Sequence, residues 1–467
     1  MTLVEELVFT LSKNERTRLR PLQFRGAKRD IIFKILECRS RNGINAASIK
    51  RRHKLTDVRY YQVLSEMLHT MYEEVAPGDG ITLLEFLGRK QLYRHFLREI
   101  RSQESDLLEA GDTAALAEYY LQVLVLSSLQ MFPLNTLPDL SDELHGYVKR
   151  YVKYKTPHPH DKYLVRVYEI SDRLGKLLEK TIRRDKLDPY VHELESIFRR
   201  TRTSSQFLVR FNVCFTLMII FARIYYDRGK ALRYIAYAKQ LVRDHADIFG
   251  DYAALFELVT DLHDLSSRQQ QTERVKKFLI APEHGENLSS IRYLERYLPM
   301  IIVSGEHEWV KAYARDHFPE QLGLVAPDAS VHYAMILTLL RISDNDLAAA
   351  EESLAIAMRA NTGRHRNMYS EMQLRCYDAF LMGMRHNPLV AEESVQRHMR
   401  YMRRQVQQPQ DSNLLIFLNA MRELLRGVEE GKGNCASIFA EFRQKYRGHE
   451  QFVFLFERLC AKFRSLG

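Results

Sequence analysis

The stretch Asn212–Gly229, NVCFTLMIIFARIYYDRG, and the stretch that follows it, Lys230–Val242, KALRYIAYAKQLV, decide the fold class. The first is apolar almost throughout, and the second has apolar residues at the three-to-four spacing of one helix face. Neither alternates as a half-buried strand does. Because a Gly closes the first segment and the second follows at once, the pair predicts a helical hairpin.

Similar pairs recur toward the C-terminus. Their turns fall near Gly229, Gly305, Asn345, Asn387 and Gly431, and the last three gaps are 40, 42 and 44 residues. The first gap, 76 residues, is about two such units. One helical hairpin cannot bury both of its faces, but stacked hairpins can. The period therefore predicts an all-α fold built as an α-solenoid, whose concave groove would hold a partner.

A second pair, Ser330–Asp346 followed by Leu347–Ala360, has an apolar first helix, an Asp/Asn turn and an Ala-rich second helix. From Gln206 to the C-terminus, such units resemble tetratricopeptide-like helical hairpins. The family's Trp-Leu-Gly-Tyr and late Pro positions are mostly absent, and the period is longer than its usual 34 residues or so. With Leu11–Glu15 as a Leu-Ser-x-Asn-Glu segment, the chain also resembles bacterial helical-repeat proteins of similar length. The resemblance implies an α-solenoid and gives no information on an activity.

The positive charge of the chain lies in its first segment. Residues 13–59 hold fifteen Lys or Arg against four Asp or Glu, a net charge of +11, while the whole chain has 69 cations, 59 acids and a net charge of +10. The other 420 residues together have a charge of −1. A localised basic segment is typical of proteins that contact phosphates or acidic partners.

Within this segment the pattern predicts helices over 27–39, 46–54 and 57–75, the outline of a helix-turn-helix. Asp57, Arg59, Tyr60 and Gln62 would then begin the reading helix. Phosphates would pass Lys50, Arg51, Arg52 and Lys54. We expect the buried stripe of the last helix to consist of Val58, Tyr61, Leu64, Leu68 and Met71.

Two other interpretations of the basic segment stay open. It can be the solvated face of an ordinary helical hairpin, because the turn lacks the frequent Gly and no β-hairpin wing follows. It can also dock on an anionic membrane surface. Against docking, the first helix, with its apolar stripe from Leu3 to Leu11, has Glu5 and Glu6 where a membrane-binding helix needs cations.

The chain divides into three expected regions: a basic helical region over 1–80, a helical linker or first hairpins over 81–205, and helical repeats over 206–467. Five widely separated cysteines without a CxxC pair predict free thiols in a reducing compartment. The most apolar run, Val213–Ala222, is too short to span a bilayer. We therefore expect a cytoplasmic protein without a transmembrane segment; its oligomeric state is left open.

No phosphate-binding Gly-rich loop, HExxH or GxSxG motif is present, so the sequence predicts neither an enzyme nor a cofactor. The tightest histidine cluster, His158–Asp161, lies beside two prolines and is expected to be a loop without a metal. The pairs of adjacent glutamates have a simple role, since acids in a first helical turn complement the helix dipole.

Other features have both a structural and a functional interpretation. Lys149–Lys155 interleaves cations with aromatic residues, which suits nucleic acid but also a helix with a wet basic side. Arg397, Arg400 and Arg404 share one helix face, as solvated side chains or as the lining of a groove for an acidic partner. Trp309 is expected to pack in a hairpin core.

Two functions from different classes follow. The first is a non-catalytic interaction scaffold, with a protein or peptide in the solenoid groove. The second is a nucleic-acid-binding regulator that contacts nucleic acid through residues 13–59 and uses the repeats as a sensor or oligomerisation region.

Overall fold

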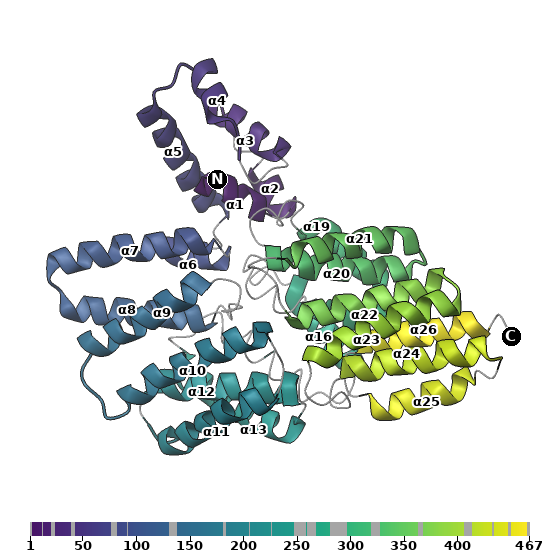
Figure 1. Ribbon diagram of the computed structural model, residues 1–467. Coiled ribbons are helices and arrows are strands. Elements are labelled where there is room, and N and C mark those ends of the chain that lie inside the picture. Colours follow the sequence, from purple (N-terminus) through teal and green to yellow (C-terminus); the bar gives the residue numbers. More distant parts are fainter. Residues whose placement is uncertain are drawn as a thin grey trace.

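A computed structural model describes residues 2–11, 13–19, 24–38, 43–75, 82–90, 92–129, 138–180, 184–204, 206–225, 227–246, 258, 268–280, 297–318, 327–362, 368–405, 413–431, 434–446 and 450–464. Over these residues the ordered elements are helices and no strand occurs (Figure 1). The all-α prediction is confirmed.

The first five helices form a head, residues 2–75, that projects from the rest of the molecule (Figure 1). In chain order they are α1 (Leu3–Thr10), α2 (Lys13–Leu19), α3 (Ala27–Glu37), α4 (Ala46–Arg52) and α5 (Asp57–Val75). Helix α1 packs on α3 and α5, and α2 packs on α5. The caps are local: Thr2 begins α1 with a capping box, and the Asn45 side chain accepts a hydrogen bond from the backbone of Ser48 in α4.

Helix α1 lies in the interior, although its sequence contains two adjacent acids. Every residue from Val4 to Thr10 is buried. The Glu5 carboxylate accepts a hydrogen bond from the Ile44 backbone N–H at 2.6 Å, and Glu6 Oε2 lies 3.0 Å from His95 Nε2. Glu5 and Glu6 therefore do not form the wet polar face that the sequence predicted, because the head and the next helical region cover them and supply their partners.

The middle of the chain forms a series of helices on one side of the molecule (Figure 1). Most neighbours in sequence also pack on one another. The elements are α6 (Leu83–Arg89), α7 (Tyr93–Ala110), α8 (Thr113–Leu129), α9 (Pro138–Tyr154), α10 (Asp161–Lys180), α11 (Arg184–Thr201), α12 (Phe207–Ile220), the π-helical turn η2 (Phe221–Tyr225) and α13 (Arg228–Asp244).

The C-terminal lobe contains the recurrent hairpins on the other side of the molecule (Figure 1). Its described helices are α16 (Arg268–Ile280), α18 (Leu298–Val303), α19 (His307–His317), α20 (Pro327–Ser343), α21 (Leu347–Ala360), α22 (Met368–Arg385), α23 (Pro388–Gln405), α24 (Asn413–Glu429), α25 (Cys435–Lys445) and α26 (Glu450–Arg464).

The turns of these hairpins lie where the sequence placed them. Gly305, Asn345 and Gly431 follow α18, α20 and α24 with φ of 92°, 64° and 64°, in the left-handed region that Gly and Asn tolerate. Asn387 precedes α23, and its side-chain oxygen accepts a hydrogen bond from the Val390 backbone at 3.0 Å. Turn chemistry therefore sets where each hairpin reverses.

The last helix, α26, closes the C-terminal lobe by packing on α18, α22 and α24. Lys462 Nζ donates to the backbone carbonyls of Gly383 and Met384 at 2.8 and 3.0 Å, and so satisfies the C-terminal end of α22. Gly383 allows the close approach, because a Cβ there would lie 3.0 Å from Leu459 Cδ1. The face shared by α18, α22 and α24 is thus covered by the chain itself.

The described apolar core consists of two clusters. The first runs from Val4 to Val242 and the second from Leu258 to Phe463. The expected boundary before Gln206 lies within the first cluster, where α11 packs on α12. Contacts of α2 with α19 and of α10 with α22 join the parts of the molecule.

No described helix combines the length and apolarity needed to cross a bilayer. All five cysteines are free thiols, and all but Cys38 are buried. Burial raises the pKa of the Cys214 and Cys460 thiols to about 12.

Candidate nucleic-acid interface

Helices α3, α4 and α5 of the head have the order and connection of a helix-turn-helix unit. The turn between α4 and α5 spans His53–Thr56, with Lys54 at φ 53°. The Leu55 backbone N–H donates to the Lys50 carbonyl at 2.9 Å, and Thr56 Oγ1 accepts from the Arg59 backbone at 3.2 Å, which caps α5. Helix α3 packs on both α4 and α5.

Helix α5 has one buried side and one exposed face. The buried residues are Tyr60, Val63, Leu64, Met67 and Met71. On the opposite side of its first turns Val58, Tyr61, Gln62 and Ser65 are exposed, and these four residues are called the exposed face of α5; the charged residues Asp57, Arg59 and Glu66 beside them are also exposed. Val58 is 69% exposed and Tyr61 64% exposed, so the predicted buried stripe was wrong at its first two positions. The physical reason is that apolar residues occur on both sides of this helix, and the head covers only the side that includes Tyr60.

Tyr60, which the sequence placed at the contact surface, points into the head and is 3% exposed. Burial raises the pKa of its phenol to about 12, with further contributions from Glu5 and Tyr61. Lys50 Nζ lies 5.8 Å from the centre of its ring. The neighbouring ring, Tyr61, has the surface position that was predicted for Tyr60.

Three cations of the predicted contact surface are held by acids of the head: Lys50 and Arg52, expected to contact phosphates, and Arg59, expected at the start of the reading helix. Lys50 Nζ lies 2.6 Å from Asp57, Arg52 NH1 2.9 Å from Asp30, and Arg59 NH1 3.0 Å from Glu66. Glu66 also pairs with Lys28 at 2.9 Å, and hydrogen bonding to this lysine is the main cause that lowers the pKa of the Glu66 carboxyl. The exposed face of α5 is therefore flanked by neutralised acids.

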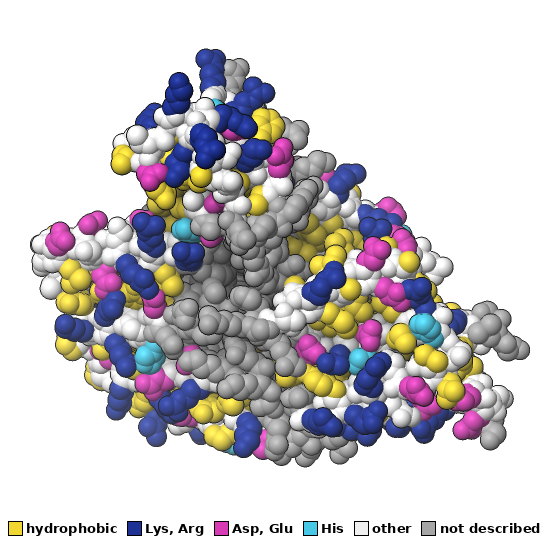
Figure 2. Space-filling model, turned by 45° about the horizontal axis from the view of Figure 1, so that its top comes forward, with side chains coloured by type: hydrophobic (Ala, Val, Ile, Leu, Met, Phe, Trp, Pro, Cys, Tyr) yellow, Lys and Arg dark blue, Asp and Glu magenta, His cyan; other side chains and the backbone are white. Residues whose placement is uncertain are grey.

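Arg51 and Lys54, the other two predicted cations, are exposed and have no ion-pair partner within the part of the chain that the structure describes. Arg51 is in the last turn of α4, and Lys54 is in the turn before α5. Arg29 on α3 is also exposed, and its guanidinium lies 5.6 Å from the centre of the Phe33 ring. Figure 2 shows Lys and Arg side chains gathered over the head.

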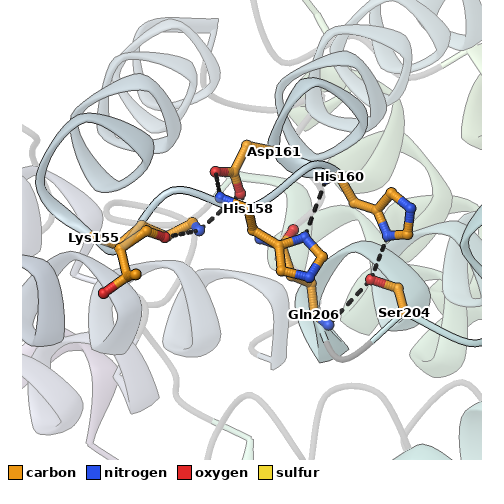
Figure 3. A network of polar contacts seen from close by, with 7 residues as sticks. Lys155, His158, His160, Asp161, Ser204 and Gln206 are labelled. Atoms are coloured by element: carbon orange, nitrogen blue, oxygen red, sulfur yellow. Dashed lines mark hydrogen bonds and ion pairs between the residues drawn. The ribbon is translucent and has the colours of Figure 1, made fainter.

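The His158–Asp161 cluster joins two inter-helical turns by hydrogen bonds (Figure 3). Asp161 accepts from the His158 backbone at 2.8 Å, pairs with Lys155 at 2.7 Å, and accepts from the Gln206 side chain. His160 Nδ1 lies 2.7 Å from Ser204 Oγ. The cluster thus links the start of α10 to the start of α12.

These contacts determine the direction in which the pKa of the Asp161 carboxyl is shifted. Burial alone would raise its pKa, but hydrogen bonds from Lys155, Gln206 and the His158 backbone outweigh burial and hold the pKa below its usual value. The polar atoms of these residues form hydrogen bonds and an ion pair with one another, so the cluster has a structural role.

A second group of metal-ligand types lies between α19 and the turn after α20. Ligand atoms of His307, Glu308 and Asp344 come within 4.8 Å of one another. Lys311 Nζ lies 2.7 Å from Glu308 Oε1 and 2.5 Å from Asp344 Oδ1, and hydrogen bonding to Asp344 and then Glu308 raises its pKa. A lysine ammonium therefore supplies the positive charge between these carboxylates.

The predicted groove arginines Arg397, Arg400 and Arg404 lie on the exposed side of α23. Arg397 donates to Ser394 Oγ at 3.4 Å, while Arg400 and Arg404 have no polar partner among the residues described. The opposite side of α23 packs on α22 and α24. These arginines form a stripe that faces solvent rather than the side covered by α26.

Two remaining predicted features have mainly structural contacts. In the 149–155 segment, Arg150 pairs with Glu104 at 2.7 Å, and Lys155 pairs with Asp161. Trp309 is partly buried and stacks on Tyr313 with ring centres 5.4 Å apart.

Searches of protein-family models, curated proteins and solved structures found no match to this chain.

Proposed function

We propose that this protein is a nucleic-acid-binding regulator and that its head is the binding module. The observation that carries the proposal is the exposed face of α5, which begins after the turn that follows α4, with the exposed cations Arg51 and Lys54, unpaired among the described residues, shortly before it in sequence. Apolar and amide side chains beside unpaired cations suit a polyanion with base edges.

The electrostatics of the head support this proposal. Each acid on or beside the first turns of α5 already has a cation: Asp57 has Lys50, and Glu66 has Lys28 and Arg59. Among the described residues, Asp57 and Glu66 are thus compensated, and the exposed cations Arg51, Lys54 and Arg29 of the head are left for an approaching phosphate.

In this proposal the other helices form a sensor or oligomerisation region. We propose that α18–α25 are tetratricopeptide-like hairpins stacked as a short α-solenoid, with α26 along one face. The left-handed turns after α18, α20 and α24 support this arrangement. The five free thiols support a reducing compartment, the cytoplasm.

The test measures binding of the protein to a random-sequence DNA duplex at increasing salt concentrations, with fluorescence anisotropy as the readout. The wild type is expected to bind at low salt, with an affinity that falls steeply as salt increases. The double variant Arg51→Ala/Lys54→Ala is expected to bind more weakly, and its salt slope should decrease by about 2, since each lost phosphate contact removes about 0.9.

The matched control is Arg400→Ala/Arg404→Ala, which removes the same charge from exposed positions on α23. Its salt slope should equal that of the wild type. Equal losses in the two double variants would show non-specific attraction to a cationic protein, and the proposal for the head would then be abandoned.

The interaction scaffold predicted from the sequence is a second candidate, supported by the arginine stripe on α23. We propose that any acidic peptide partner would bind this stripe, since α26 covers the face shared by α18, α22 and α24. Titration of a labelled poly-glutamate peptide tests this. Replacement of Arg397, Arg400 and Arg404 by Ala should abolish its binding, whereas Arg51→Ala/Lys54→Ala should not.

A further inference from the structure

Helix α5 has the size and exposure that insertion into a DNA groove requires. It has 19 residues, and its exposed face is in the first turns, at the end nearest to Arg51 and Lys54. A helix about 10–12 Å across fits the B-DNA major groove, which is about 12 Å wide. The major groove of duplex RNA is too narrow for side chains to read, so this face favours duplex DNA.

The exposed apolar side chains Val58 and Tyr61 have a matching group in that groove. Single apolar residues on a surface are ordinary, but these two are one helical turn apart, they shortly follow the exposed cations Arg51 and Lys54 in sequence, and the other side of their helix is buried. The only apolar group that a base presents in the major groove is the C5-methyl of thymine. Val58 and Tyr61 are therefore suited to thymine.

Gln62 adds a polar contact to the same face. Its Oε1 accepts a hydrogen bond from Arg59 NH1 at 3.3 Å, and Arg59 is itself held by Glu66. Arg59 thus holds the Gln62 amide in one orientation. The second lone pair of Oε1 and both Nε2 hydrogens are left to form hydrogen bonds with a base. A glutamine with these groups available is suited to the N7 acceptor and N6 donor of adenine.

We propose that α5 binds in the major groove of duplex DNA and selects A·T base pairs, with Val58 and Tyr61 on thymine methyl groups and Gln62 on an adenine edge. Arg51 and Lys54 then contact the flanking phosphates and set the register. This inference rests on the proposed nucleic-acid binding by the head and adds the kind of nucleic acid and the residues that determine specificity.

The experiment begins with selection of preferred duplexes from a randomised DNA pool by the full chain. Each thymine of the selected duplex is then replaced by deoxyuracil, which removes only the methyl group. Replacement at the contacted positions is expected to weaken binding about threefold to tenfold, the effect of a lost methyl contact.

The variants assign each position. Val58→Ala should remove the thymine-to-deoxyuracil difference at one position and Tyr61→Ala at another, while Gln62→Ala should relax the preference for one adenine. Leu389→Ala is the control, because it truncates another exposed apolar side chain, on α23, and should change none of these differences. Equal unfolding midpoints verify that the variants fold.

The outcomes separate this inference from the proposed function. Equal affinity for thymine and deoxyuracil duplexes, equal affinity for an RNA duplex of the selected sequence, or a selection without a preferred sequence would overturn major-groove reading. In each of these cases a steep salt dependence lost in Arg51→Ala/Lys54→Ala would leave the proposed function standing. Absence of any duplex binding at low salt would overturn both.

Discussion

At the residue scale, the ion pair between Glu15 and Lys90 is notable because both side chains are buried. Glu15 belongs to α2, and Lys90 directly follows α6. Both are almost fully buried, with exposures of 4% and 1%, and they pair with each other. Breaking a buried ion pair is strongly destabilising, because the remaining charge loses a nearby opposite charge that offset its removal from water.

We therefore predict that Lys90→Met lowers the free energy of unfolding by about 3–5 kcal/mol. Urea denaturation followed by circular dichroism measures this. Lys445→Met is the control, because Lys445 forms a solvent-exposed pair with Glu441 and its loss should barely change the free energy of unfolding. Similar losses in the two variants would refute the importance of the buried pair.

Asp161 gives a pH-dependent prediction. Because its folded pKa lies below its ordinary value of 3.8, its contacts stabilise the protein fully above that value and are lost as the pH falls through the folded pKa. Asp161→Asn should lower the unfolding free energy by about 1–3 kcal/mol at pH 7. The difference from the wild type should stay constant from pH 7 to 5 and shrink below pH 3.8.

Urea titrations at several pH values measure the difference. Asp106→Asn, at an exposed position of α7, should follow the wild type at every pH. A difference for Asp161→Asn that grows on acidification would contradict the assigned direction.

The candidate site could be predicted from the sequence as a segment but not residue by residue. Charge counting located the head, and the helix-turn-helix spacing located α4 and α5. Helical spacing could not distinguish Tyr60 from Tyr61, because apolar residues are present on both sides of α5. Which side is buried depends on α1 and α3, whose contacts come from the three-dimensional fold.

At the element scale, the left-handed turns define the hairpins. Gly305 has a φ of 92° and open space around its Cα, so a methyl group would meet no neighbour but would strain the backbone. We predict that Gly305→Ala lowers the unfolding free energy by about 1–2 kcal/mol.

The matched control is Gly146→Ala in the interior of α9, which also has open space. There the same substitution should stabilise the protein by up to about 1 kcal/mol, because Ala is the better helix former. Chemical denaturation of both variants measures the two signs. A stabilising Gly305→Ala would show that this turn does not require a left-handed residue.

Most helices could be predicted from the sequence, because turn residues and apolar spacing are local properties. The position of α26 was not. Its contacts depend on Gly383, which permits the approach of Leu459, and on Lys462, which caps α22 across 79 residues of sequence. A repeat pattern shows that a helix is apolar, but it does not identify the helices that cover it.

At the scale of the whole molecule, the division into two apolar clusters predicts how the protein unfolds. Phe417 is fully buried in the second cluster, and Phe96 is fully buried in the first. A buried Phe→Ala change costs about 3–5 kcal/mol. We predict that Phe417→Ala increases amide hydrogen exchange mainly in α18–α26, and that Phe96→Ala does so mainly in α1–α13.

Hydrogen exchange with mass spectrometry gives the regional readout, with Leu389→Ala as a surface control. Equal increases throughout the molecule in both variants would show that the two clusters unfold as one cooperative unit.

The sequence predicted the helical class of the molecule but not how its distant parts meet. The contacts of α2 with α19 and of α10 with α22 join helices far apart in the chain. No periodicity encodes such contacts, because they depend on the summed geometry of all intervening turns.

The burial of α1 has a consequence for synthesis. This helix is synthesised before the groups that complete its surroundings, Ile44 and His95. At about 5–20 residues per second, its apolar side chains wait on the order of ten seconds before residue 95 has been added. During that time the nascent chain presents a short hydrophobic helix that chaperones can hold, and the head cannot reach its final structure until its own neighbours have been made.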